Sequence, residues 1–329
     1  MGRVLRIVAL GALALLAAGP AVAANPRLRV ELVDRPKRII VRDTACPGDR
    51  APADRTTWRR RIVETAALEW EAFRFSTLDI ASRGLPRVPT LGTLASGRTP
   101  RTIVPDAANP PLADEPARRL LRVGLSEDAA ETTLRIGGYW AVVPLQSAVD
   151  TQNALWRIWA DTGWAQPWSA AFVSWVMCEA GLPLEAFDRH PQHAGYIAHL
   201  YANPQAAFAP QPITERAEPG DLVCAGRGDS QDVANLEEGW ALAAASGPMH
   251  CDIVVGGAPD RLYLIGGNVE NSVTLTVAPA RDGRIEPNAA RRWFGVFRLK
   301  APSDPDAAID KVGFACLGRP DAKACLAER

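Results

Sequence analysis

The sequence lacks most of the short motifs that mark well-known enzyme classes. It contains no P-loop, no Rossmann glycine fingerprint, no H-E-x-x-H, no G-x-S-x-G and no S-x-x-K. No C-x-x-C occurs either, which argues against a zinc ribbon and against a thioredoxin-like redox centre. We therefore expect chemistry that uses neither a metal nor a cofactor.

A surplus of charge of either sign is also missing. The 329 residues include 37 basic and 37 acidic side chains, and the formal net charge is zero. Because binding to a polyanion relies on a basic surplus, this balance predicts no nucleic-acid partner. The hydrophobic content of 47% is too high for global disorder, and the length allows a sizeable core in one or two domains.

The first 23 residues have the three parts of a secretory signal peptide. Arg3 and Arg6 give a positive start, residues 7–19 form an apolar run, and residues 21–23 (Ala-Val-Ala) form a small-residue cleavage site. The apolar run is shorter than the ~20 residues that cross a bilayer; an uncleaved membrane anchor is the alternative. We predict an exported bacterial protein, periplasmic or secreted, without stable membrane insertion once the signal is removed.

The six cysteines are an even number, which in an exported chain predicts disulfide bonds. Cys224 ends one predicted strand and Cys251 begins the next, so a disulfide between them would clamp the two strands. Free buried thiols are the alternative. Cys316 and Cys325 are near neighbours in the carboxyl-terminal tail and are candidates for closing a local loop. Cys178 is predicted to be buried or disulfide-bonded.

Helical and strand patterns occupy different halves of the chain. Apolar residues recur at helical spacing over residues 58–75, which predicts a helix there. A second helix is predicted to start near Pro167 and to end by Ala180, because Gly181 suits a carboxyl-terminal cap. Runs typical of strands follow at residues 220–224, 251–255, 261–265, 272–277 and 293–299.

Helices followed by an antiparallel meander are typical of the α+β class. Two Gly-Gly pairs, at 256–257 and 266–267, predict turns between the strands. The remaining organisation is an extended lead-in (24–57), a single domain (58–299) with an insertion around residues 76–135, and a carboxyl-terminal tail (300–329).

Three polar residues stand in an order that suits nucleophilic catalysis. Ser169 lies at a predicted helix start, where unpaired N–H groups and the helix dipole favour negative charge. His250 directly precedes a predicted strand and is a candidate base, and Asn268 follows the next strand, where a polar side chain would orient the imidazole. Plainer interpretations are a helix cap for Ser169, a surface histidine for His250 and a turn residue for Asn268.

The motifs around these residues resemble a bacterial family, the domain-of-unknown-function 2272 family, over roughly residues 58–299. That family is similar to NlpC-type and CHAP-type cell-wall peptidases. The resemblance implies a papain-like (NlpC-type) core, with amino-terminal helices packed on an antiparallel sheet of about five strands. The motifs are Pro167-Trp168-Ser169 with the helix after it, His193-x-x-Tyr196, Pro219-Gly220-Asp221-Leu222, His250-Cys251-Asp252 and Gly266-Gly267-Asn268.

The resemblance implies that Ser169 stands where the peptidases have a cysteine nucleophile, with His250 as base and Asn268 as orienting residue. A serine hydroxyl is far less acidic than a thiol, so it needs a well-placed base. Ser169 is therefore either a working nucleophile or the mark of a domain that only binds. Cys178 lies nine residues after Ser169, which places it on the opposite side of the helix, so it is a poor substitute nucleophile.

Five further residues are candidates for binding a substrate. Alternation along a strand would place Asp252 on the same face as His250. His193 would line the groove, although a structural surface role is the alternative; Arg227 would meet a substrate carboxylate, although a solvated arginine is the plainer interpretation. Trp168 would stack on a sugar ring unless it belongs to the core. The candidates are Trp168, His193, Tyr196, Asp252 and Arg227.

The leading hypothesis is an exported hydrolase of amide bonds that acts on peptidoglycan peptides through Ser169, His250 and Asn268. The substrate class follows only from the resemblance and the export signal. The alternative is a non-catalytic envelope protein that binds peptidoglycan or a protein partner through the same groove.

Overall fold

The computed structural model describes residues 25–34, 37–81, 119–144, 147–160, 162–286 and 291–309, which form an α+β fold. The predicted signal peptide, much of the predicted insertion, and Cys316 and Cys325 lie outside these ranges. Within them, no helix has the length and apolarity needed to cross a membrane.

The largest element of the fold is a mixed sheet that is mostly antiparallel. Its eight main strands run in the order β4-β3-β9-β8-β7-β6-β11-β5, and the short β10 pairs with β9. Among the strands that the structure describes, only β3 and β9 pair in parallel. In chain order the strands are β3 (Ser76–Asp79), β4 (Arg119–Arg122), β5 (Phe208–Pro212), β6 (Leu222–Gly226), β7 (Met249–Ala258), β8 (Arg261–Val269), β9 (Ser272–Arg281), β10 (Arg284–Ile285) and β11 (Trp293–Leu299).

The five strands predicted from the sequence form the centre of this sheet, as β6, β7, β8, β9 and β11. The edges were not predicted. Both β3 and β4 come from the region expected to be an insertion, and each is only four residues long, too short for a clear alternation of apolar residues. The sheet is therefore larger than the five strands expected.

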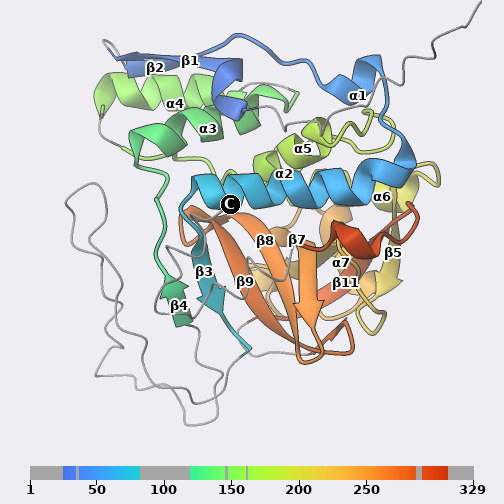
Figure 1. Ribbon diagram of the computed structural model, residues 1–329. Coiled ribbons are helices and arrows are strands. Elements are labelled where there is room, and N and C mark those ends of the chain that lie inside the picture. Colours follow the sequence, from blue (N-terminus) through green and yellow to red (C-terminus); the bar gives the residue numbers. More distant parts are fainter. Residues whose placement is uncertain are drawn as a thin grey trace, which may run out of the picture.

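Helices cover one face of the sheet in two layers. Figure 1 shows α2 (Trp58–Ala72) lying across the sheet with α5 (Ser169–Glu179) beside it, as predicted for both segments. Both helices contact β7 and β8. Farther from the sheet lie α3 (Ala130–Ala141) and α4 (Ser147–Ile158). The others are α1 (Pro47–Arg50), α6 (His193–Ala202) and α7 (Leu236–Ala244).

Helix α5 is the central helix of the core. All eleven of its residues are buried, so the helix has no solvent-facing side. It ends in a Schellman motif, in which the N–H of Gly181 bonds to Cys178 and that of Leu182 to Met177. The left-handed conformation of Gly181 (φ +84°) makes this ending possible, as the sequence predicted. The motif fixes where the helix ends.

Within the predicted lead-in (24–57), the described residues include a two-stranded hairpin. Strands β1 (Val30–Asp34) and β2 (Lys37–Val41) pair with each other in antiparallel register. The side chain of Asn153 on α4 accepts a hydrogen bond from the Ile39 N–H (2.7 Å) and donates one to its carbonyl (2.8 Å). Because Asn153 satisfies these backbone groups of β2 much as a third strand would, the hairpin is anchored to the helical layer.

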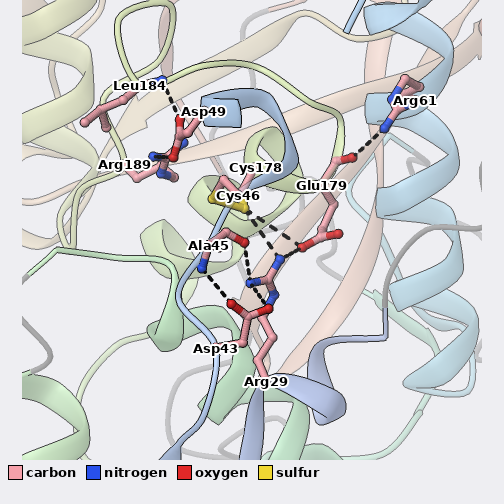
Figure 2. Close-up of a disulfide and its surroundings, with 10 residues drawn as sticks. All are labelled: Arg29, Asp43, Ala45, Cys46, Asp49, Arg61, Cys178, Glu179, Leu184 and Arg189. Atoms are coloured by element: carbon pink, nitrogen blue, oxygen red, sulfur yellow. Dashed lines mark hydrogen bonds and ion pairs between the residues drawn. A yellow bond between two sulfur atoms is a disulfide. The ribbon is translucent and has the colours of Figure 1, made fainter. Parts of the chain in front are cut away.

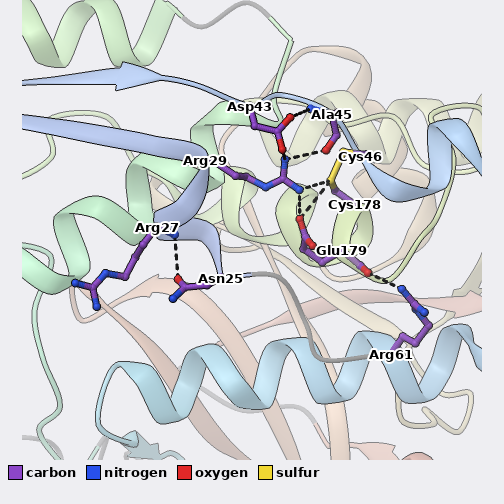
Figure 3. Close-up of polar contacts among 9 residues, drawn as sticks. All are labelled: Asn25, Arg27, Arg29, Asp43, Ala45, Cys46, Arg61, Cys178 and Glu179. Atoms are coloured by element: carbon purple, nitrogen blue, oxygen red, sulfur yellow. Dashed lines mark hydrogen bonds and ion pairs between the residues drawn. A yellow bond between two sulfur atoms is a disulfide. The ribbon is translucent and has the colours of Figure 1, made fainter. Parts of the chain in front are cut away.

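A disulfide joins the lead-in to the core helix. Cys46, next to α1, is bonded to Cys178 near the end of α5 (S–S 2.06 Å), as Figure 2 shows. Beside it the guanidinium of Arg29 is buried and paired with the Glu179 carboxylate, and it donates to the Ala45 carbonyl (2.8 Å; Figure 3). A covalent bond and a buried ion pair therefore hold the amino-terminal segment against α5.

The motif Pro219-Gly220-Asp221 has a structural role. The Asp221 carboxylate is fully buried and accepts hydrogen bonds from Arg59 (2.8 Å) and from the backbone N–H groups of Leu299 (3.0 Å) and Glu218 (2.9 Å). Arg59 in turn donates to the carbonyls of Pro219, Leu299 and Pro302. This network joins α2 to the start of β6 and the end of β11.

Candidate functional site

Ser169 is the first residue of α5, and its side chain is hydrogen bonded to a residue of another helix. The N-cap residue is Trp168, and neither residue makes a side-chain capping bond, so Ser169 is not a simple cap. Instead the Ser169 Oγ lies 2.7 Å from Nε2 of His193, and its side chain is only 3% exposed. The serine is therefore a buried partner of a histidine from another helix.

His193 and Tyr196 belong to the first turn of α6. They are three residues apart, which places them on one side of the helix, and the Tyr196 hydroxyl is hydrogen bonded to Nδ1 of His193. Both side chains are buried. Ser169, His193 and Tyr196 thus form a continuous chain of hydrogen-bonding groups across two helices.

His250 and Asp252 share one face of β7, as the alternation predicted. Nε2 of His250 lies 2.8 Å from Oδ1 of Asp252, and the second carboxylate oxygen is paired with Arg291. The residue between them, Cys251, is bonded to Cys224 on β6 (S–S 2.05 Å), so the predicted disulfide clamps this strand pair. The ring of His250 packs edge-on against that of His193, with centroids 5.1 Å apart.

The contacts differ from the predicted triad in two ways. The histidine bonded to Ser169 is His193, whereas the Nδ1 of His250 is buried without a hydrogen-bond partner in the described part of the chain. The side chain that holds His250 is Asp252; Asn268 is half-buried and makes no side-chain hydrogen bond to His250 among the described residues. The sequence alone could not show the Ser169–His193 contact, because it depends on how two helices pack. His250 and Asp252 are only two residues apart, and strand alternation already predicted that they share a face.

Gly266 and Gly267 lie within β8 instead of forming a turn. The turn falls at Glu270 and Asn271, where the backbone is left-handed. A Cβ on Gly266 would lie 1.9 Å from Oδ1 of Asp252, and one on Gly267 would lie 2.5 Å from Cβ of Phe172 in α5. These glycines are needed because the strand passes close to the His250–Asp252 pair and to α5.

Replacing Gly266 by alanine is expected to displace Asp252 and to destabilise the fold by about 1–3 kcal/mol, the range for forcing extra volume into a packed core. Chemical denaturation would measure the loss. Gly137→Ala in α3 is the matched control, since its Cβ would lie 3.3 Å from the flexible end of Ile39 and should change stability little. Equal stability of the two variants would contradict the close approach at Gly266.

Burial sets the protonation states of the site. It lowers the pKa of His193 well below the usual histidine value, with the nearby His250 as a second cause. It also lowers the pKa of His250, although Asp252 opposes this effect. Burial raises the pKa of Asp252, but His250 and Arg291 more than offset this and hold it below its usual value. At neutral pH both imidazoles are therefore uncharged and Asp252 is a carboxylate.

Two predicted binding residues lie at different depths. Trp168 is fully buried, stacks on Phe73 and donates its indole N–H to Glu127 (2.7 Å), so it belongs to the core and supports the start of α5. Arg227 is exposed at the end of β6, near enough for its charge to lower the pKa values of both His193 and His250. In the described part of the chain no cluster of three His, Cys, Asp or Glu residues is arranged to hold a metal ion.

Comparison with known proteins places the site within a described family. Residues 128–298, more than half of the chain, match the family described as "Uncharacterized protein conserved in bacteria (DUF2272)". No curated protein and no solved structure matches the chain. The matched range includes every residue of the site, from Ser169 to Arg291.

Proposed function

Because the chain belongs to the bacterial DUF2272 family, whose description assigns no activity, we propose from the site itself that the protein is a hydrolase of amide bonds. Its nucleophile is Ser169 and its substrates are peptidoglycan peptides. The observation that carries the proposal is that Ser169, at a helix amino terminus, is hydrogen bonded to the buried, uncharged His193. The ring of His193 packs against a second buried histidine, His250, which a carboxylate holds.

The proposed reaction is an acyl transfer, first to Ser169 and then to water. The Ser169 oxygen attacks the amide carbonyl while its hydrogen passes to Nδ1 of His250, which becomes an imidazolium stabilised by Asp252. The unpaired backbone N–H groups at the start of α5 stabilise the oxyanion. The imidazolium then protonates the leaving nitrogen as the C–N bond breaks, and water hydrolyses the acyl-serine with His250 again as base.

The substrate class is supported by charge and by location. Arg227 is exposed near the histidines, whereas the charge of Arg291 is paired with Asp252, so the exposed positive charge beside the site is that of Arg227. A peptide with a free carboxylate suits such a surface. The two disulfides are typical of proteins that mature in an oxidising compartment, as expected for an enzyme of the envelope.

One observation favours the alternative of binding without catalysis. Ser169 and His250 are each 3% exposed, so a substrate carbonyl reaches Oγ only after neighbouring atoms move. An envelope protein that binds peptidoglycan or a protein partner needs no such access.

The deciding experiment is to incubate the mature protein with defined peptidoglycan fragments and to identify the products by mass spectrometry. We expect one amide bond to be cleaved, and we expect Ser169→Ala and His250→Ala to abolish cleavage. Ser174→Ala is the matched control, because Ser174 also lies on α5 but bonds to the backbone of His190 (3.1 Å). Retention of fragments without cleavage would support the alternative, and cleavage by Ser169→Ala would refute the mechanism.

A further inference from the structure

The hydrogens along the Ser169–His193–Tyr196 chain can be assigned by elimination. Within the described residues, the Tyr196 hydroxyl has one hydrogen-bond partner, Nδ1 of His193. A buried hydroxyl needs an acceptor for its hydrogen, so Tyr196 donates to Nδ1. His193 is uncharged and carries one ring hydrogen, which must then be on Nε2. His193 therefore donates to the Ser169 oxygen, and the Ser169 hydrogen is left for another acceptor.

No described group accepts that hydrogen at hydrogen-bond distance, and the buried acceptor that still lacks a donor is Nδ1 of His250. Its Nε2 donates to the Asp252 carboxylate, so the buried Nδ1 holds a lone pair for which the described residues offer no donor at hydrogen-bond distance. The ring that carries it packs against His193. With the opposite tautomer Ser169 would donate to His193, and the hydrogen of the fully buried Tyr196 hydroxyl would have no acceptor among the described residues, which is rare for a buried polar group.

We propose that His193, held in one tautomer by Tyr196, donates a hydrogen bond to the Ser169 oxygen and directs the Ser169 hydrogen toward Nδ1 of His250. The catalytic part of this inference rests on the proposed function. His193 takes up no proton; its N–H stabilises the negative charge that develops on Oγ as the hydrogen leaves. A serine in place of a thiol needs this help, because its hydroxyl is a much weaker acid.

Substitutions of His193 can distinguish whether this residue acts as a hydrogen-bond donor or as a base. The amide N–H of glutamine can replace the Nε2–H of histidine but cannot act as a base at neutral pH. We expect His193→Ala to lower kcat/KM by about 10²–10³-fold, the loss on removing one such donor, and His193→Gln to recover most of it. The acid limb of the pH profile, which reports the base His250, should persist in His193→Gln. A glutamine variant as inactive as the alanine variant, or one without the acid limb, would overturn the proposal.

A second measurement needs no activity. Nitrogen-15 NMR of the histidine side chains in the mature wild-type protein should show His193 with its hydrogen on Nε2 and His250 with its hydrogen on Nε2. In Tyr196→Phe the His193 hydrogen should move to Nδ1 in a fraction of molecules, because the donor to Nδ1 is gone. A wild-type His193 with its hydrogen on Nδ1 would overturn the assignment even if the protein cleaves peptides. Conversely, the expected tautomers in a protein that cleaves nothing would refute only the proposed hydrolase.

Discussion

Removing the Cys46–Cys178 disulfide by a double serine substitution is expected to destabilise the protein by about 5 kcal/mol. The two cysteines are 132 residues apart, and in the chain-entropy account a cross-link over so long a loop restricts the unfolded chain strongly. Both sulfurs are buried, and the neighbouring Arg29–Glu179 pair would lose part of its support. Equilibrium unfolding in denaturant would measure the loss.

The second disulfide is the natural control for this prediction. Cys224 and Cys251 are 27 residues apart, so their removal is expected to cost less, about 3.6 kcal/mol. The order of the two losses tests the argument better than either value. If removing Cys224–Cys251 destabilises the protein more, loop length does not determine the loss of stability. Strain or local packing would then determine it.

Replacing Arg59 by methionine is expected to destabilise the fold by about 3–5 kcal/mol. The substitution removes the nearer of the two charged partners of the buried Asp221 carboxylate and leaves only Arg298, whose Nε lies 3.5 Å from Oδ2. Burial already raises the pKa of that carboxyl against the effect of Arg59. Methionine has a similar length, so the loss would come from the charge and the hydrogen bonds rather than from a cavity. Denaturant unfolding at neutral pH is the measurement.

Arg60→Met provides the matched control. Arg60 is adjacent on α2 but half exposed, and its pair with Asp304 (3.3 Å) should contribute at most about 1 kcal/mol. A double variant, Arg59→Met with Asp221→Leu, should recover part of the stability, because it removes the buried carboxylate that has lost its nearer partner. If Arg59→Met and Arg60→Met prove equally stable, the buried network does not hold α2 to the sheet.

The central part of the fold could be predicted from local pattern. Helix α2, helix α5 and the five central strands each carry a periodicity or a cap that needs no knowledge of distant residues. The glycine pair in β8 was misread because a turn and a close approach both select glycine. Only the structure shows that Asp252 lies where the Gly266 side chain would be.

The sequence named several residues of the candidate site but could not show which of them contact one another. The sequence named Ser169, His193, Tyr196, His250 and Asp252, and the structure brings these side chains together. Which histidine bonds to Ser169 depends on how α6 packs against α5, and no local pattern encodes that. Arg291 was not predicted, because one arginine among many gives no signal until its pairing with Asp252 is known.

The bare backbone at Gly266 also bears on how related sequences can be recognised. A histidine and an aspartate two residues apart on a strand are a common pattern and say little alone. Here the neighbouring strand can pass beside the pair only where it has no side chain. A family sequence that holds the same pair should therefore have glycine at position 266. Asn268 makes no hydrogen bond to the pair among the described residues, and its left-handed backbone (φ 56°) restricts that position for a reason unrelated to the pair. Glycine at position 266 is a better search criterion for an intact site than the polar residue that follows it.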